Sequence, residues 1–369
     1  MLDDTHRTER TLGVVPMLNR AVHEDVRHDR GLAVARERRR RIADQMAGLL
    51  QHHDRHGACD DEDDPAQQQD RKRVVSRVVD PRHEIERTIQ SNRVPSLRSR
   101  LLVAVLRATK RKAPYVDPRL LHERIAEERR TVDATPPRRL RLDERFVAGV
   151  RVLTAGTGGR RLLFLHGGSY VFEIAPEHYR FCATLARALD ATITIPIYPL
   201  APECSAIDIQ AKLRAVIDAL GPFDAWLGDS AGAGLALALA QRLDRPPPLV
   251  LLSPWLDIAL ENPAIGPIDD RDPWLSRPGL RECGRLYAKD LDPKDPRVSP
   301  LYGPLHAIVR ISMFIGTRDI FLSDARKLRD RAPDKIALFE YPEMVHDFML
   351  IRVLPEARSA FREIVKTLR

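Results

Sequence analysis

The most informative segment of the sequence is Gly228-Asp229-Ser230-Ala231-Gly232, which matches the pattern G-x-S-x-G. It lies between the apolar run at residues 225–227 and an Ala/Leu-rich segment, so it predicts a strand, a sharp turn and a helix. Small residues on both sides of Ser230 let neighbouring backbone approach, while the turn exposes the serine hydroxyl. The N-terminus of the following helix favours negative charge developing beside that hydroxyl. The motif therefore predicts that Ser230 is a nucleophile.

Short β-rich runs alternate with helical runs beyond residue 144. This alternation predicts an α/β fold, in which helices flank a mostly parallel central sheet on both faces. The expected strands are residues 146–153, 161–165, 191–197, 225–227, 249–252, 309–315 and 336–341. The expected helices are residues 176–189, 207–220, 232–243 and 324–332. We expect residues 144–369 to form the catalytic domain.

A serine hydroxyl is a weak nucleophile, so it needs a base that a third group holds in place. In this arrangement the acid and then the histidine are expected to follow the serine along the chain. His346 follows the last expected strand, whereas His306 precedes a strand and is expected to be a surface or packing residue. Asp319 follows the next-to-last expected strand, whereas Asp324 is expected to cap the next helix. We therefore predict a triad of Ser230, Asp319 and His346.

Acyl transfer also needs donors for the tetrahedral oxyanion. His166-Gly167-Gly168-Ser169 follows an expected strand, and its paired glycines leave backbone N–H groups free to point into a cleft. His166 is expected to brace this loop rather than to act as a base. The expected oxyanion donors are the backbone amides of Gly167, Gly168, Ser169 and Ala231.

Charge and aromatic residues are unevenly distributed over the 369 residues, which carry a formal net charge of +8. No Phe, Trp or Tyr precedes Tyr115. A segment without aromatic side chains and rich in charge runs buries too little apolar surface to offset chain entropy. We therefore expect residues 1–93 to be a disordered or non-native extension. A nucleic-acid-binding arm at residues 38–41 is the alternative, and the nearly balanced charge around it argues against nucleic acid as a partner.

Residues 81–143 carry the positive excess, and residues 94–143 are expected to form helices. Apolar residues recur every four positions from Leu97 through Leu101 to Val105, and Asp117-Pro118 supplies an N-cap and a first-turn proline for a second helix. We expect the basic residues to form a solvated face on a helix docked by the apolar ones. Weak contact with an anionic lipid surface is the alternative.

No uncharged stretch approaches the roughly 20 apolar residues that a membrane-spanning helix needs, so stable membrane insertion is not expected. The four cysteines show neither a disulfide framework nor metal-ligand spacing. The glycine cluster at residues 156–159 lacks the order typical of dinucleotide binding. We expect a cytoplasmic protein with reduced thiols.

These motifs resemble those of the bacterial hormone-sensitive-lipase-like esterases, also called the family IV branch of the α/β-hydrolase fold. The resemblance covers roughly residues 94–369. Residues 166–169 resemble the family's H-G-G-G loop, and residues 228–232 are similar to its G-D-S-A-G turn. Further similar stretches are residues 198–203, 252–257 and 298–301. The sequence departs from the family pattern at Ser169, Pro199 and Ile320, and none of these changes removes a catalytic group.

The resemblance implies a serine carboxylic-ester hydrolase that needs no metal or organic cofactor. It implies Ser230 as the nucleophile, Asp319 as the triad acid and His346 as the base. The implied oxyanion amides are those of Gly168, Ser169 and Ala231, and Gly167 would shape the turn.

A helical cap is also implied, built from the N-terminal helices and an insertion at about residues 260–295. We expect small-molecule ester substrates with short- to medium-chain acyl groups. Two alternatives stay open, namely an amide or lactone hydrolase and a non-catalytic small-molecule-binding protein on the same fold. The presence of His346 argues against the binding protein.

Overall fold

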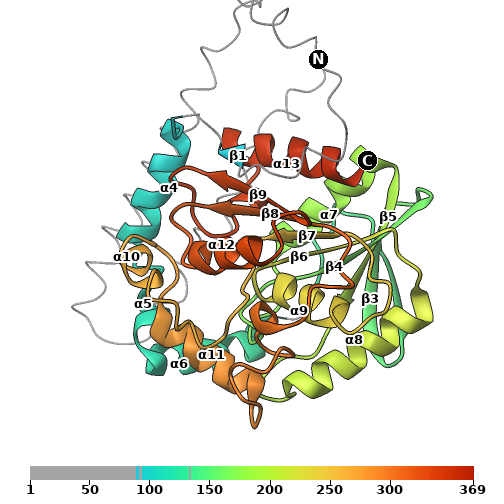
Figure 1. Ribbon diagram of the computed structural model, residues 1–369, viewed down its shortest axis with the longest axis horizontal. Coiled ribbons are helices and arrows are strands. Elements are labelled where there is room, and N and C mark those ends of the chain that lie inside the picture. Colours follow the sequence, from blue (N-terminus) through green and yellow to red (C-terminus); the bar gives the residue numbers. More distant parts are fainter. Residues whose placement is uncertain (1–88, 91–93, 133) are drawn as a thin grey trace, which may run out of the picture. The chain divides into compact units, whose positions relative to one another are not determined.

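The computed structural model describes residues 89–90, 94–132 and 134–369 (Figure 1). The expected extension at residues 1–93 therefore lies almost entirely outside the described residues, and so does the basic run at residues 38–41. The boundary expected between residues 94–143 and 144–369 stays a prediction.

The described residues form a nine-stranded sheet in the order β1-β9-β8-β7-β6-β4-β5-β3-β2. The first seven strands in this order, which end with β5, are parallel to one another. The last two, β3 and β2, add an antiparallel edge. The strands are β1 (Ile89–Gln90), β2 (Asp143–Val147), β3 (Val150–Ala155), β4 (Arg160–Leu165), β5 (Ala191–Ile197), β6 (Ala225–Asp229), β7 (Leu249–Leu252), β8 (Ile311–Gly316) and β9 (Ile336–Tyr341). The predicted mostly parallel α/β fold is confirmed.

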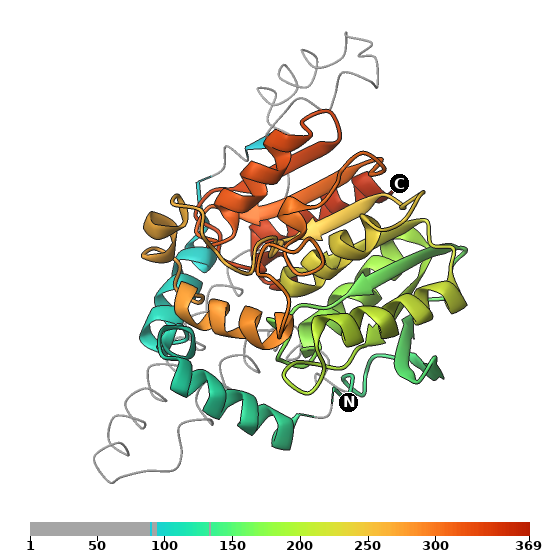
Figure 2. The same ribbon diagram turned by 60° about the horizontal axis from the view of Figure 1, so that its bottom comes forward.

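Helices cover both faces of this sheet (Figures 1 and 2). Helices α7 and α13 contact each other on one face, whereas α8, α9 and α12 cover the other. The helices of the sheet layers are α7 (Pro176–Leu189), α8 (Ala206–Leu220), α9 (Ser230–Ala240), α12 (Leu322–Arg331) and α13 (Pro355–Leu368). Two short 3-10 helices also occur: η2 (Pro300–Tyr302) lies between α11 and β8, and η3 (Phe348–Leu350) lies between β9 and α13. Among the described residues, no helix is both long enough and apolar enough to cross a membrane.

A second group of helices comes from two distant parts of the chain. It consists of α4 (Leu97–Ala108), α5 (Ala113–Val116), α6 (Pro118–Thr131), α10 (Ile265–Asp269) and α11 (Arg277–Ala288). Helices α5, α6 and α11 contact one another, and Figure 2 shows α11 beside α5 and α6. Asp117 caps α6 as predicted, because its side chain accepts a hydrogen bond from the Arg119 N–H.

Two expectations about local structure need correction, and one helix was not expected. The run expected as one strand at residues 146–153 is a hairpin, because Ala148 and Gly149 take positive φ angles of 50° and 74° and turn β2 into β3. Helix α13 was not predicted. Leu97 does not dock its helix, since its side chain is 70% exposed, while Leu101 and Val105 are half-buried.

The turn between β6 and α9 is held by very close backbone packing. Ser230 has a φ of 50°, in the left-handed region, and every residue of α9 is buried. A Cβ on Gly232 would lie 2.1 Å from the Leu165 carbonyl oxygen at the end of β4. The turn therefore needs glycine at this position, since any other side chain would push α9 away from the sheet.

We predict that Gly232→Ala lowers the thermal unfolding midpoint, because overpacking a buried site costs roughly 1–3 kcal/mol. Each kcal/mol corresponds to about 2–4 °C in a domain of this size. Gly159→Ala is the matched control, since a Cβ there would meet nothing within 4 Å. Circular dichroism melts of the two variants test this, and equal midpoints would contradict the packing argument.

Candidate active site

The predicted site residues lie where the parallel strands end at their carboxyl edge. The register places Leu165 of β4 beside Gly228 of β6, and Asp229 beside Leu252 of β7. Loops that leave these strands therefore start at the same edge, where ligands bind in open α/β sheets. The loops that follow β8 and β9 reach the same place.

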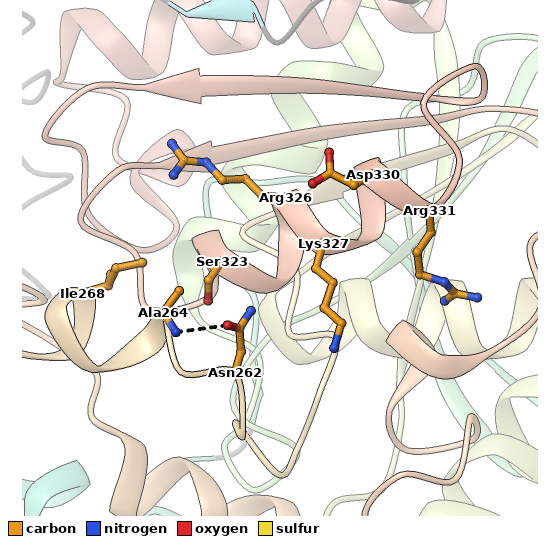
Figure 3. Close-up of a pocket in the computed structure, with 8 residues that line it drawn as sticks. All are labelled: Asn262, Ala264, Ile268, Ser323, Arg326, Lys327, Asp330 and Arg331. Atoms are coloured by element: carbon orange, nitrogen blue, oxygen red, sulfur yellow. Dashed lines mark hydrogen bonds between the residues drawn. The ribbon is translucent and has the colours of Figure 1, made fainter.

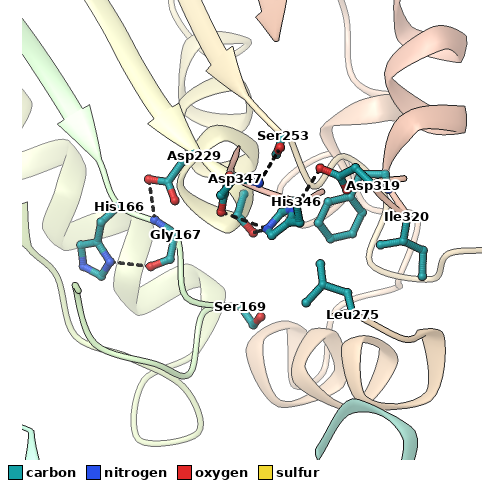
Figure 4. A network of polar contacts seen from close by, with 12 residues as sticks. His166, Gly167, Ser169, Asp229, Ser253, Leu275, Asp319, Ile320, His346 and Asp347 are labelled. Carbon is teal, nitrogen blue, oxygen red and sulfur yellow. Dashed lines mark hydrogen bonds and ion pairs between the residues drawn. The ribbon is translucent and has the colours of Figure 1, made fainter. Parts of the chain in front are cut away.

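Ser230, His346 and Asp319 are in hydrogen-bond contact. His346 Nε2 lies 3.0 Å from Ser230 Oγ, and His346 Nδ1 lies 2.9 Å from Asp319 Oδ2. The other oxygen of Asp319 accepts a hydrogen bond of 3.0 Å from the backbone N–H of Phe321. All three side chains are buried. The structure thus brings together the three residues that the sequence proposed as a triad, of which Figure 4 labels Asp319 and His346.

Two carboxylates act on the His346 imidazole. Burial lowers the pKa of His346, but the charges of Asp347 and Asp319 outweigh burial and hold that pKa well above its usual range. Asp347 Oδ2 lies 3.0 Å from His346 Nε2, the same nitrogen that faces Ser230. The sequence analysis did not identify Asp347, whose only signal was its position directly after the histidine.

The loop at residues 166–169, here called the oxyanion loop, lies against the turn at Ser230. A Cβ on Gly167 would lie 2.2 Å from Asp229 Oδ2, so only glycine allows this approach. The Gly167 N–H donates to Asp229 Oδ1 at 3.0 Å and is therefore engaged. This geometry corrects the expectation that the Gly167 amide is an oxyanion donor. The amides of Gly168, Ser169 and Ala231 stay candidates, and Ala231 lies in the first turn of α9, where N–H groups lack helical partners.

Asp229 connects the oxyanion loop to α7. Its second oxygen, Oδ2, lies 2.9 Å from His178 Nε2, and the Ala175 N–H donates to His178 Nδ1, so Nε2 carries a proton. Burial lowers the pKa of His178, but the Asp229 carboxylate outweighs it and raises the pKa. Sequence reasoning missed this pair, because His178 lies on a helix far from the turn in the chain.

His166 braces the oxyanion loop, as the sequence analysis expected. Its ring stacks on Tyr198 at 4.3 Å between ring centroids, and its Nδ1 lies 2.7 Å from the Gly167 carbonyl oxygen. Burial, with the neighbouring His178, lowers the pKa of His166 to about 4. This neutral ring contacts Tyr198 and the oxyanion loop, whereas the hydroxyl of Ser230 contacts His346.

Asp272 joins the insertion before α11 to the loop that holds Asp319. One carboxylate oxygen accepts from the backbone N–H groups of Trp274 and Leu275 at 2.8 and 2.9 Å. The other accepts from the Ile320 N–H at 3.1 Å. Burial and the nearby Asp319 charge raise the pKa of Asp272 to about 7. This contact, which the sequence did not reveal, fixes the insertion directly beside the triad.

The two alternatives weighed for the triad lie elsewhere. His306 is exposed in the loop before β8. Asp324 lies in the first turn of α12, where it accepts a hydrogen bond of 2.9 Å from Asn262 instead of capping the helix. Neither residue contacts Ser230 or His346.

Tyr115 from α5 reaches the oxyanion loop. Its hydroxyl lies 3.1 Å from Ser169 Oγ, and both side chains are buried. Gly279 of α11 packs so closely on Tyr115 that a Cβ there would lie 2.4 Å from the tyrosine Cα. In Figure 4, Leu275 lies between Ser169 and Ile320 in the view, below His346. The N-terminal helices and the insertion therefore meet over the site.

An open pocket of about 640 Å³ lies away from this site, between α10 and α12 (Figure 3). Its basic side chains already have partners, since Arg326 pairs with Glu340 and Lys327 lies over the Tyr302 ring. The residues that line it are Asn262, Ala264, Ile268, Ser323, Arg326, Lys327, Asp330 and Arg331. None of them belongs to the predicted site, and we assign this pocket no ligand.

Comparisons with known proteins place this geometry in a family. A family profile described as alpha/beta hydrolase fold matches residues 162–350. An acetyl-hydrolase from Streptomyces hygroscopicus is 33% identical over 57% of this chain and 75% of its own length. An esterase from Acinetobacter venetianus is 31% identical over 60% of this chain and 79% of its own length.

A solved structure described as a hormone-sensitive lipase from a metagenome library superimposes with a TM-score of 0.61 and 28% identity. The match covers 73% of this chain and 97% of that chain. The matched region contains the oxyanion loop, Ser230, Asp319 and His346. The chain therefore belongs to the α/β-hydrolase fold family, among the hormone-sensitive-lipase-like enzymes of the esterase and lipase type.

Proposed function

We propose that this protein hydrolyses carboxylic esters with short- to medium-chain acyl groups through Ser230, His346 and Asp319. The observation that carries the proposal is the hydrogen-bonded line from Ser230 Oγ to His346, at 3.0 Å, and on to Asp319, at 2.9 Å. A histidine between a serine and a buried carboxylate is the arrangement that activates a hydroxyl for acyl transfer.

In the proposed reaction, Ser230 Oγ attacks the ester carbonyl while His346 Nε2 takes the hydroxyl proton. Asp319 holds the proton on Nδ1, so that Nε2 is the free base, and it stabilises the imidazolium that forms. The imidazolium then gives its proton to the leaving alcohol. Water repeats the sequence on the acyl-enzyme, with His346 as general base, and releases the acid.

The oxyanion of the tetrahedral intermediate would lie near the amides of Gly168, Ser169 and Ala231. The engaged Gly167 amide supports this set, because its bond to Asp229 fixes the loop that presents the next two amides. Preorganised donors of this kind stabilise the developing charge without reorganising during the reaction. Asp229 and His178 are thus proposed to act on the oxyanion loop and not on the substrate.

The preference for shorter acyl groups rests on what closes over Ser169. Tyr115 contacts Ser169 directly, and α11 packs tightly against Tyr115 through Gly279. Tyr115 therefore cannot move without disturbing α5 and α11. In this proposal it limits the length of the acyl group that binds beside Ser169. The name of one relative, an acetyl-hydrolase, agrees with small acyl groups.

We predict that Ser230→Ala lowers kcat on p-nitrophenyl butyrate by roughly 10⁴–10⁶-fold, since triad members act as a unit. Asp319→Asn should also be severely impaired, because the imidazole loses the acceptor that sets its tautomer. Asp324→Asn is the matched control and should retain most activity, since Asp324 bonds only to Asn262 among the described residues. Wild-type turnover by Ser230→Ala would contradict the proposed nucleophile.

We predict that kcat/KM falls steeply for p-nitrophenyl esters longer than about eight acyl carbons, although each buried methylene can contribute about 0.8 kcal/mol. Butyrate and hexanoate esters should therefore be better substrates than decanoate or longer esters. Faster hydrolysis of triolein emulsions, with activation at the lipid interface, would overturn this preference. Such a result would favour lipid contact through the basic helix α4.

A further inference from the structure

The catalytic nitrogen of His346 has two neighbours in this structure. Its Nε2 lies 3.0 Å from Ser230 Oγ and 3.0 Å from Asp347 Oδ2. Since Asp319 occupies Nδ1 at 2.9 Å, the imidazole is held between two carboxylates. The proposed mechanism uses one of them and leaves the other unexplained.

Asp347 is fixed in this position by its backbone. Its φ of 48° lies in the left-handed region, which aspartate tolerates better than most residues. Its N–H donates to Ser253 Oγ at 3.0 Å, which ties the residue to the end of β7. The side chain is buried, and its Oδ1 has no hydrogen-bond partner among the described residues. The carboxylate therefore depends on His346 for its polar contact.

Several charged groups surround this pair. Asp229 at the end of β6 and Asp319 after β8 act on Asp347, and His178 of α7 lies close enough to interact with it. Asp272, from the insertion before α11, interacts with His346. Besides Asp347, the carboxylates of Asp319 and Asp272 thus interact with the imidazole, and Asp319 favours its positive charge.

We propose that Asp347 is a positioning residue that holds the Nε2 proton of His346 in competition with Ser230, and that it thereby sets the lower pH limit of turnover. The proposal rests on the proposed function, since it concerns the availability of the same base. A protonated His346 bound to Asp347 cannot accept the serine proton. Ester hydrolysis then requires the imidazolium to lose its proton before Ser230 can attack.

The sign of the pH effect follows from the charges. Burial lowers the pKa of His346, and Asp347, followed by Asp319, raises it well above its usual range. Burial raises the pKa of Asp347 to about 6, while the adjoining imidazolium opposes that rise. Above that pH the carboxylate is charged and retains the imidazolium. Removing the charge of Asp347 must therefore move the appearance of the neutral base to lower pH.

The test is Asp347→Asn, which keeps the side-chain shape and tolerates the left-handed backbone but removes the charge. We expect the acid limb of the plot of kcat/KM against pH to shift to lower pH by roughly one to three pH units. A shift of this size is typical for loss of an opposite charge within hydrogen-bond distance. The substrate is p-nitrophenyl butyrate, read where the phenol and the phenolate absorb equally. Asp324→Asn is the control, because that buried carboxylate does not contact His346, and its acid limb should stay in place.

A second measurement does not depend on turnover. The rate at which an organophosphate modifies Ser230, followed by mass spectrometry, should show the same downward shift of its acid limb in Asp347→Asn. An unmoved limb in both measurements would overturn the proposal, even where kcat falls, because a purely structural residue changes kcat without moving the limb. If Asp347→Asn does not fold, Asp347→Gly serves instead, since glycine also accepts a φ of 48°.

Failure of the proposed function would look different. In that case wild-type protein would not hydrolyse the ester, or Ser230→Ala would still do so. Activity that depends on Ser230, together with an unmoved acid limb in the Asp347 variants, would overturn the role of Asp347 alone.

Discussion

The site depends on one close approach, that of the oxyanion loop to the turn at Ser230. Gly232 meets the carbonyl oxygen of Leu165 at a distance that excludes any Cβ, and Gly167 meets Asp229 in the same way. The two contacts fix the end of β4 against the start of α9. Without them the hydroxyl of Ser230 and the amides beside it would have no fixed spacing. Oxyanion stabilisation depends on such fixed spacing, because donors that must reorganise lose most of their advantage.

Motifs in which neighbours in the chain are also neighbours in space were readable from the sequence. The turn at residues 228–232 and the oxyanion loop were recognised because glycine and small residues stand at fixed spacing within a few positions. The parallel sheet was predictable because apolar runs alternate with helical ones, and the order of Ser230, Asp319 and His346 selected one acid and one base. The functional roles of these three residues stay predictions that the variants test.

What the sequence did not reveal are contacts between distant elements. His178 meets Asp229, Asp272 meets the Ile320 amide, and Tyr115 meets Ser169, each across tens of residues or more. No local periodicity or spacing in the sequence indicates such pairs, because they form only when packing of the folded core brings distant elements together. The hairpin at β2 and β3 was missed for another reason. Ala148-Gly149 is a weaker turn signal than Asn-Gly, and it interrupts one continuous β-rich run.

The structure places more negative charge around His346 than a base alone requires. A carboxylate on Nδ1 orients the ring, but a carboxylate on Nε2 stabilises the imidazolium before any reaction begins as well as during it. Stabilising the charged form in both states raises the energy needed to form the neutral base while it lowers the energy of the tetrahedral intermediate. The net effect on rate therefore depends on pH. Energy is needed to form the neutral base only below the pKa of the imidazole, where the ring is protonated before the reaction begins. The geometry at Asp347 thus couples the strength of the base to the conditions under which it is free to act.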